Sequence, residues 1–189
     1  VDFAKQHGQS IATATGELLS KELTPLHGKL EGHSKWIALS FDKLPTRDEY
    51  AAIAANTNLH FAISYAAQKN VARLDRGEKL PTEFPYFVQT WNFGNELALV
   101  FLPGEVVVDY SLRLKKEYDP SRLWVNAYAN EVPGYIPSKR IWNEGGYEGG
   151  GAMIYYDKPT RLTEDTEERI IKAVHDLMPK TFLFDEKKA

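Results

Sequence analysis

The feature that most constrains the fold is a run of six apolar residues, 97–102, that leads directly into Pro103-Gly104-Glu105. Such a run, bounded by turn residues, is typical of a buried strand. Phe93-Gly94-Asn95 separates it from another strand-like stretch and predicts a hairpin. A helical stretch follows, and then a second strand at about 123–129. Because strands and helices alternate but at least one strand pair is a hairpin, we predict an α/β (α+β) fold, with a mixed β-sheet core covered by helices.

Hydrophobic spacing and turn residues place the remaining elements. Thr46 and Glu49 form a capping box at the start of one helix. Thr163 is predicted to cap another helix, whose first turn is acidic, as the helix dipole favours. Pro25 and Pro179 are expected to stop helices. We predict helices at 3–23, 47–55, 59–74, 107–117 and 164–177, and strands near 29–41, 86–92, 96–102, 123–129, 152–156 and 181–184. The charged tail, 185–189, is expected to fray.

The composition limits the class of protein. At 189 residues, 43% of them hydrophobic, the chain is long enough for one packed core. We predict a single domain over 1–189, or the C-terminal portion of a larger one, since the chain starts at Val1 inside a helical pattern. Its net charge of −3 and the lack of a Lys/Arg stripe argue against a nucleic-acid partner. No apolar run approaches the length of a membrane span. The absence of cysteine excludes disulfides and a thiol nucleophile.

Glu105 is the first candidate for chemistry, because it follows Pro-Gly at the end of a strand that is apolar on both faces. The simpler interpretation, which the sequence alone favours, is a glutamate in the first turn of the next helix, where the helix dipole stabilises its charge. The alternative is a carboxylate metal ligand or general base held on a rigid element. Ligands gather outside the carboxyl ends of strands in open α/β sheets, so we expect the site at this edge.

Two tyrosines, Tyr135 and Tyr147, lie in the loop region that follows the 123–129 strand. Loop tyrosines usually pack with their hydroxyls in water. The five glycines of 145–151 suggest a backbone that turns sharply or approaches a ligand closely, but this segment lacks the Lys-Ser/Thr of a phosphate loop. The five histidines form no His-x-His or His-Glu-x-x-His pair, and none is assigned as a ligand. The chain has no Gly-x-Ser-x-Gly motif to mark a serine nucleophile.

Four segments, in a fairly specific order, resemble the neutral/alkaline (non-lysosomal) ceramidase family. They are LALVFLPGE at 97–105, SLRLK at 111–115, NAYANEVPGYIPS at 126–138 and GGYEGG at 145–150. The resemblance covers residues 97–150. It suggests that the chain is the C-terminal part of a ceramidase-type catalytic domain.

The resemblance implies a zinc-dependent N-acyl amide hydrolase whose lipid amide substrate, ceramide, is converted to sphingosine and a fatty acid. It implies that Glu105 and Tyr135 are zinc ligands, and that Tyr147 lies at the substrate and takes part in the catalysis. We also assign Asn130 and Glu148 to substrate binding. The chemistry is coherent, because a carboxylate and a phenolate are hard oxygen ligands that leave zinc strongly Lewis acidic. A nearby tyrosine hydroxyl is suited to stabilising an oxyanion.

The chain departs from the family in lacking the upstream histidine ligands and the upstream catalytic serine. We therefore expect the histidines outside this chain, on a missing N-terminal segment of the same protein, and we expect the fragment alone to be inactive. One alternative is a non-catalytic module in which Trp124 and Trp142 line a lipid or glycan groove. Another is a hydrolase of smaller amides. The resemblance suggests a secreted, periplasmic or membrane-associated extracytoplasmic location.

Two expectations concern the structure itself. Glu105 and Tyr135 should face each other across one cleft, with the carboxylate and the hydroxyl within about 6 Å, since two bonds of about 2 Å must share one ion. The strands at 35–41 and 97–102 are apolar on both sides, which calls for cover on both faces of the sheet. The predicted helices are too few for that, so we expect an exposed apolar sheet face, and either self-association or attachment to the missing segment.

Overall fold

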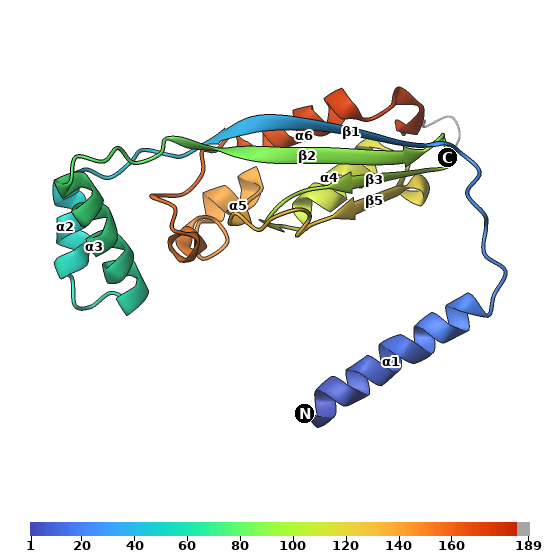
Figure 1. Ribbon diagram of the computed structural model, residues 1–189, viewed down its shortest axis with the longest axis horizontal. Helices are drawn as coiled ribbons and strands as arrows, with labels where there is room; N and C mark the ends of the chain where they lie inside the picture. The colour runs from blue at the N-terminus through green and yellow to red at the C-terminus, as the bar shows by residue number, and fades with distance from the viewer. Residues whose placement is uncertain (185–189) are drawn as a thin grey trace.

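The computed structural model describes residues 1–184, and the tail whose fraying was predicted lies outside them. Its centre is a mixed four-stranded sheet in the order β1-β2-β3-β5 (Figure 1). The long strands β1 (Leu30–Ser40) and β2 (Glu83–Phe93) pair antiparallel, and β3 (Leu97–Phe101) continues the meander as the predicted hairpin. β5 (Leu123–Asn126) then pairs parallel with β3. The predicted α/β class with a mixed sheet is therefore confirmed.

Within residues 1–184, helices cover one face of this sheet and leave the other uncovered. Burial along β2 alternates strictly between buried and accessible residues, as in a sheet with one covered side. The cover consists of α4 (Asp109–Glu117) and α6 (Thr166–Leu177), and α6 packs against both β1 and β2. The largest fully buried side chains of this layer are Tyr86, Tyr110, Tyr118, Phe182, Leu39, Leu102, Leu114, Leu123, Ile136, Met153, Leu162 and Ile170.

The other face of the sheet is open. We call its central part the open face and define it by Leu30, Gly32, Ser34, Trp36, Phe87, Gln89, Trp91, Phe93, Leu97, Leu99, Phe101, Trp124 and Asn126. The strand register continues this side of the sheet with Ala38, Ser40, Glu83 and Pro85 at the far end of the β1–β2 pair. Trp36 and Trp124 are 59% and 61% exposed. The expectation of an exposed apolar sheet face is thus confirmed, whereas cover on both faces is not found among the described residues. Trp142, the proposed groove partner of Trp124, is instead half-buried on another element, and its indole N–H donates to the Leu162 carbonyl over 2.8 Å.

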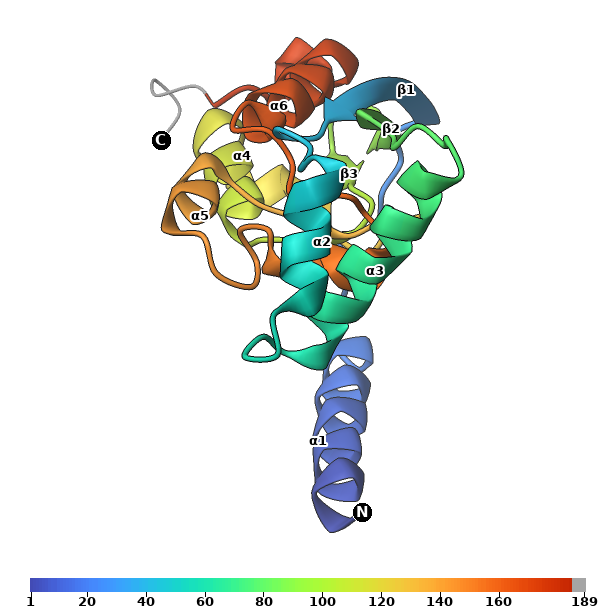
Figure 2. The ribbon, with the colours of Figure 1, turned by 90° about the vertical axis from the view of Figure 1, so that its left-hand side faces the viewer.

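The remaining helices lie at the periphery. α2 (Arg47–Ala55) begins at the predicted capping box of Thr46 and Glu49 and packs against α3 (Phe61–Asp75). α1 (Asp2–Leu19) extends away from the sheet with no buried residue (Figure 2). None of the helices in the described part of the chain has the length and apolar character needed to cross a membrane.

Several element predictions need correction. The predicted strand at 152–156 is a 3-10 helix, η2 (Gly151–Tyr156), because its backbone bonds to the third residue back and finds no strand neighbour. The predicted strand at 181–184 is largely η3 (Lys180–Phe182), with a single bridge from Leu183 to Tyr118. The first helix ends at Leu19, before Pro25 is reached. The strand predicted at 123–129 stops at Asn126, because the chain turns at Tyr128.

Candidate functional site

The candidate site lies just beyond the carboxyl ends of β3 and β5, where the chain forms a second, two-stranded sheet. Its strands are β4 (Glu105–Val106) and β6 (Tyr135–Ile136), and they pair parallel with Glu105 opposite Tyr135. The prediction that these two residues share one place is confirmed; their function as ligands stays a prediction. The simpler interpretation of Glu105 is wrong, since α4 begins four residues later, at Asp109, and Glu105 belongs to a strand.

Backbone and side-chain hydrogen bonds fix the turn that presents Glu105. The buried Tyr86 hydroxyl donates to the Pro103 carbonyl over 2.8 Å. The Gly104 N–H donates to the Glu131 carbonyl, and the Glu105 N–H to the Gly134 carbonyl, both over 2.9 Å. Gly104 has φ +85°, and a Cβ there would lie 2.6 Å from the Gly134 oxygen. Only glycine fits, because this conformation is disfavoured for other residues and the neighbouring backbone leaves no room.

Tyrosine hydroxyls surround the Glu105 carboxylate. Tyr156 donates to one carboxylate oxygen, and Tyr128 donates to the other over 2.8 Å. These hydrogen bonds, from Tyr156 first and Tyr128 next, lower the pKa of Glu105 below its ordinary value, and Tyr135 adds a smaller effect in the same direction. Hydrogen bonds to a carboxylate favour its charged form. Glu105 is therefore ionised at neutral pH.

The same contacts keep the surrounding phenols neutral. The hydrogen bond to Glu105 is the main cause that raises the pKa of Tyr135 to about 12, and it does the same for Tyr156. It also raises the pKa of Tyr128. A phenol that donates to a carboxylate resists losing its proton, since a second negative charge would then face the first. At neutral pH the site is one carboxylate within a set of neutral hydroxyl donors.

Tyr128 and Tyr156 are members of the site that the sequence reasoning missed. Tyr128 has φ +55° and Asn130 φ +66°, so the loop after β5 contains two left-handed residues that are not glycine. This conformation is common for asparagine but unusual for a bulky aromatic residue, and such outliers cluster at functional sites. It turns Tyr128 toward Glu105. The only sequence signal was the recurrence of tyrosine near the motif segments, in NAYAN and IYYD.

Tyr147, the predicted catalytic residue, lies at the edge of this cluster. Its ring packs edge-on against Tyr135, with centroids 5.5 Å apart, and lies 6.1 Å from the ring of Tyr155. It is 50% exposed, so a molecule in solution can reach its side chain. Within residues 1–184 its hydroxyl forms no hydrogen bond with another side chain or with the backbone, and it is available to a ligand.

The two predicted substrate-binding residues lie on different sides of the cluster. Glu148 follows Tyr147 and is exposed, and its charge contributes, after the larger effect of Glu105, to the raised pKa of Tyr135. Asn130 is exposed and reaches toward the sheet, where its side-chain N–H donates to the side-chain oxygen of Gln89 over 3.4 Å. Asn130 therefore connects the site to the open face.

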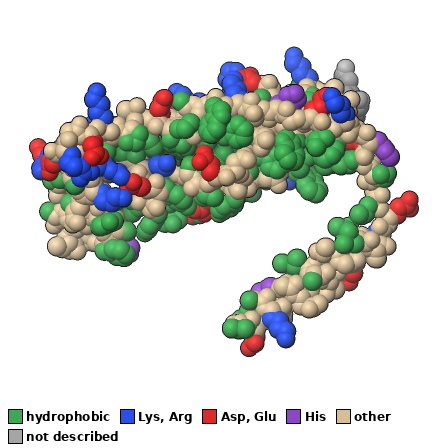
Figure 3. Space-filling model, viewed as in Figure 1, with side chains coloured by type: hydrophobic (Ala, Val, Ile, Leu, Met, Phe, Trp, Pro, Cys, Tyr) green, Lys and Arg blue, Asp and Glu red, His purple; other side chains and the backbone are tan. Residues whose placement is uncertain are grey.

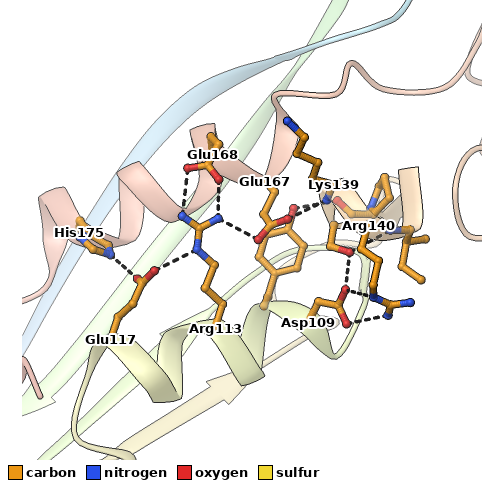
Figure 4. Close-up of polar contacts among 12 residues, drawn as sticks. Asp109, Arg113, Glu117, Lys139, Arg140, Glu167, Glu168 and His175 are labelled. Atoms are coloured by element: carbon orange, nitrogen blue, oxygen red, sulfur yellow. Dashed lines mark hydrogen bonds and ion pairs between the residues drawn. The ribbon is translucent and has the colours of Figure 1, made fainter. Parts of the chain in front are cut away.

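An ion-pair network holds α5 (Lys139–Glu144), the helix that leads from Tyr135 to Tyr147 (Figure 4). The Ser138 hydroxyl caps this helix by accepting from the Ile141 N–H and donates to Asp109 over 2.5 Å. Arg140 forms two hydrogen bonds to the same Asp109 carboxylate, over 3.0 and 2.9 Å. Asp109 thus accepts three hydrogen bonds, one from Ser138 and two from Arg140, and these connect α5 to the start of α4.

Arg113 makes the second half of the network and joins α4 to α6. Its guanidinium bonds Glu117 at 3.0 Å, Glu167 at 2.9 Å and Glu168 at 2.6 Å (Figure 4). Glu167 also accepts from the Lys139 N–H over 2.7 Å, at the first turn of α5. The hydrogen bonds that Arg113 donates, to Glu168 foremost, raise its pKa. The network holds α5 in place, and the loop that carries Tyr147 begins at the end of this helix.

The metal-binding capacity of the described residues is incomplete. Glu105 and Tyr135 offer two hard oxygen donors, which suit zinc, but residues 1–184 contain no cluster of three or more His, Cys, Asp or Glu that could hold a metal. Two of the five histidines are engaged elsewhere: His60 caps α3, and His175 bonds Glu117 at 2.6 Å. Catalytic zinc generally has three protein ligands. The donors present therefore fit part of a zinc site.

A cavity of about 400 Å³ lies behind the Tyr147 loop. One wall is apolar and comes from α2 and α3, with Ile53, Ile63 and Ala67. The opposite wall is glycine backbone at 149–151, together with Ile154. Glycines on both sides of Tyr147 thus line this cavity, whose lining also includes the polar Asn70, Lys158 and Arg161.

Comparison with family models, with curated proteins and with solved structures finds no match to this chain.

The first prediction concerns the Glu105 turn. Gly104→Ala should lower the free energy of unfolding by at least about 2 kcal/mol, since it adds a backbone clash to an unfavourable φ. Gly77→Ala is the matched control, because Gly77 has φ +76° but open space around its Cβ position, and it should cost only about 1 kcal/mol. Urea denaturation of both variants measures the difference. Equal losses would show that the Gly104–Gly134 contact imposes no constraint.

The second prediction concerns the Glu105 carboxyl group. The pKa of Glu105 is lower in the folded protein than in the unfolded chain. This difference stabilises the fold fully at pH values above the pKa of the unfolded chain, and the stabilisation is lost as the pH falls through the pKa of the folded protein. Tyr156→Phe should raise the pKa of Glu105 toward its ordinary 4.5, and Tyr135→Phe should raise it less. NMR titration of the labelled carboxyl carbon measures both changes, with the exposed Tyr65→Phe as control. A Glu105 pKa unmoved by Tyr156→Phe would contradict the assigned contact.

Proposed function

We propose that this chain carries part of the active site of a zinc-dependent N-acyl amide hydrolase of the neutral ceramidase type, which converts ceramide to sphingosine and a fatty acid. The observation that carries the proposal is the pairing of β4 with β6, which places Glu105 opposite Tyr135 at the carboxyl edge of the sheet. The resemblance of 97–150 to the ceramidase family supports it, since the paired residues are the two that the family motifs make zinc ligands.

In this proposal Glu105 and Tyr135 hold the metal. When bound, zinc supplies a Lewis acid for amide hydrolysis. Glu105 is already ionised, but Tyr135 has a pKa of about 12, raised by Glu105. Its hydroxyl must lose a proton to become a ligand, so metal binding releases that proton and strengthens as the pH rises. The remaining ligands, histidines, come from polypeptide outside residues 1–189, which we take to be an N-terminal segment of the same protein.

The other residues of the cluster act on the substrate. Tyr147 has an exposed hydroxyl beside Tyr135, and it donates to the carbonyl oxygen of the amide, whose negative charge grows during attack. Asn130 and Glu148 flank the cluster and orient the polar head of the substrate. The apolar cavity behind the Tyr147 loop has the volume and lining for a hydrocarbon chain. This cavity is the feature that favours a lipid amide over a smaller amide.

The third prediction separates metal binding from chemistry in the intact protein. Glu105→Gln should lose bound zinc and with it hydrolysis of an N-acyl sphingosine. Tyr147→Phe should keep the zinc and lose activity by about 10²–10³-fold, the cost of removing one oxyanion donor. Glu131→Gln changes an exposed glutamate of the neighbouring loop and should keep both. Elemental analysis and a fluorescent ceramide assay give the two readouts. Full activity in Glu105→Gln would exclude the proposed site.

The fourth prediction concerns the chain alone. Residues 1–189 should bind zinc weakly or not at all, because two oxygen donors are too few, and they should not hydrolyse ceramide. Isothermal titration with zinc measures the affinity. A stoichiometric, tightly bound zinc that persists in Glu105→Gln would show that the histidines of this chain form a site of their own.

A further inference from the structure

We propose that the open face is a self-complementary surface, and that two copies of this chain associate through it with their sheets stacked face to face. The proposal is independent of the proposed function. It starts from the size and chemistry of the open face, on which hydrophobic side chains gather over β1, β2, β3 and β5 (Figure 3). Contiguous apolar patches of this kind mark interaction sites in soluble proteins.

The absence of charge makes the surface compatible with its own copy. None of the thirteen residues that define the open face is charged, and its polar members are Ser34, Gln89 and Asn126. The charged residue that the register places on the same side of β1 and β2 is Glu83, at the far end of β2. The charged residues of β1 point to the opposite side, where Lys35 pairs with Asp176 of α6 at 2.8 Å. A twofold dimer brings identical patches together, and like charges at the centre would oppose it. The central part of the open face has no such charge, and Glu83 lies at its margin.

The aromatic residues of the open face are already ordered by contacts within the sheet. Trp36 packs on Phe87 with ring centroids 4.8 Å apart, and Trp91 packs on Phe101 at 5.1 Å. The Trp91 ring also lies over Gly32, where an added Cβ would come within 3.3 Å of it. Side chains fixed before association lose little entropy on binding. Tryptophan is the residue most enriched at the energetic centres of interfaces.

The dimensions indicate a weak but specific dimer. With strand spacings of about 4.8 Å and a rise of about 3.3 Å per residue, the open face has a flat footprint on the order of 400 Å². Because side chains project from the sheet and add surface, two copies would bury a total of roughly 1,000 Å², the lower limit of a specific interface. Stacked sheets about 10 Å apart form a core that resembles a β-sandwich. We therefore expect dissociation in the micromolar range.

Sedimentation equilibrium of the full chain across micromolar concentrations tests the proposal. The expected result is a reversible dimer with twice the 21.4 kDa mass of the chain, and a red shift of tryptophan emission on dilution. Trp36→Lys and Trp124→Lys should each weaken the dimer at least about tenfold, the scale of an interface hot spot, with unchanged circular dichroism. Tyr65→Lys, at a side chain 62% exposed on α3, should leave the dimer intact.

Three outcomes would overturn the proposal. The first is a monomer at every concentration. The second is association that is lost in Ile11→Lys or Leu18→Lys but kept in the two tryptophan variants, which would make α1 the contact. The third is a monomer that adsorbs to phosphatidylcholine vesicles through Trp36 and Trp124, which would make the open face a lipid-binding surface.

Discussion

The parallel pairing of β3 with β5 is the constraint on which the candidate site depends. Parallel neighbours bring two strand ends to the same edge of a sheet. Here both segments continue past that edge and pair again as β4 and β6. Glu105 and Tyr135 are thus neighbours because of backbone hydrogen bonds, before any side-chain interaction is considered. Sites built on strands in this way hold their geometry better than sites built on loops alone.

The electrostatics of the site follow from this placement. A single carboxylate receives hydrogen bonds from Tyr156 and Tyr128 and lies beside Tyr135. At neutral pH it is an anion among neutral phenols, and the charge of Glu148 acts on the same Tyr135. A cation placed there would stabilise the Glu105 carboxylate in place of the phenolic protons. Cation binding and release of a phenolic proton are therefore coupled. This coupling connects the placement of Tyr135 beside Glu105 to the proposed zinc chemistry.

Much of the fold was predictable because local signals agreed with it. The Thr46–Glu49 capping box is present, α2 spans the predicted residues 47–55, and the hairpin at Phe93-Gly94-Asn95 joins β2 to β3. The neighbouring positions of Glu105 and Tyr135 were also predictable, because both follow apolar segments, 97–102 and 123–129, that were expected to lead to a common sheet edge. Tyr128 and Tyr156 were not, since their contacts depend on a left-handed backbone at one residue and a 3-10 turn at the other. The apolar pattern of residues 97–102 indicated two covered faces, but Leu99 and Phe101 remain accessible on the open face.

The most direct test of the account is a crystal structure of the intact, zinc-loaded protein with anomalous diffraction measured at the zinc absorption edge. We expect one strong peak between β4 and β6, with a Glu105 carboxylate oxygen and the Tyr135 oxygen each about 2 Å from it. A catalytically active protein whose zinc peak lies elsewhere, with Glu105 still bonded to the Tyr128 and Tyr156 hydroxyls, would contradict it.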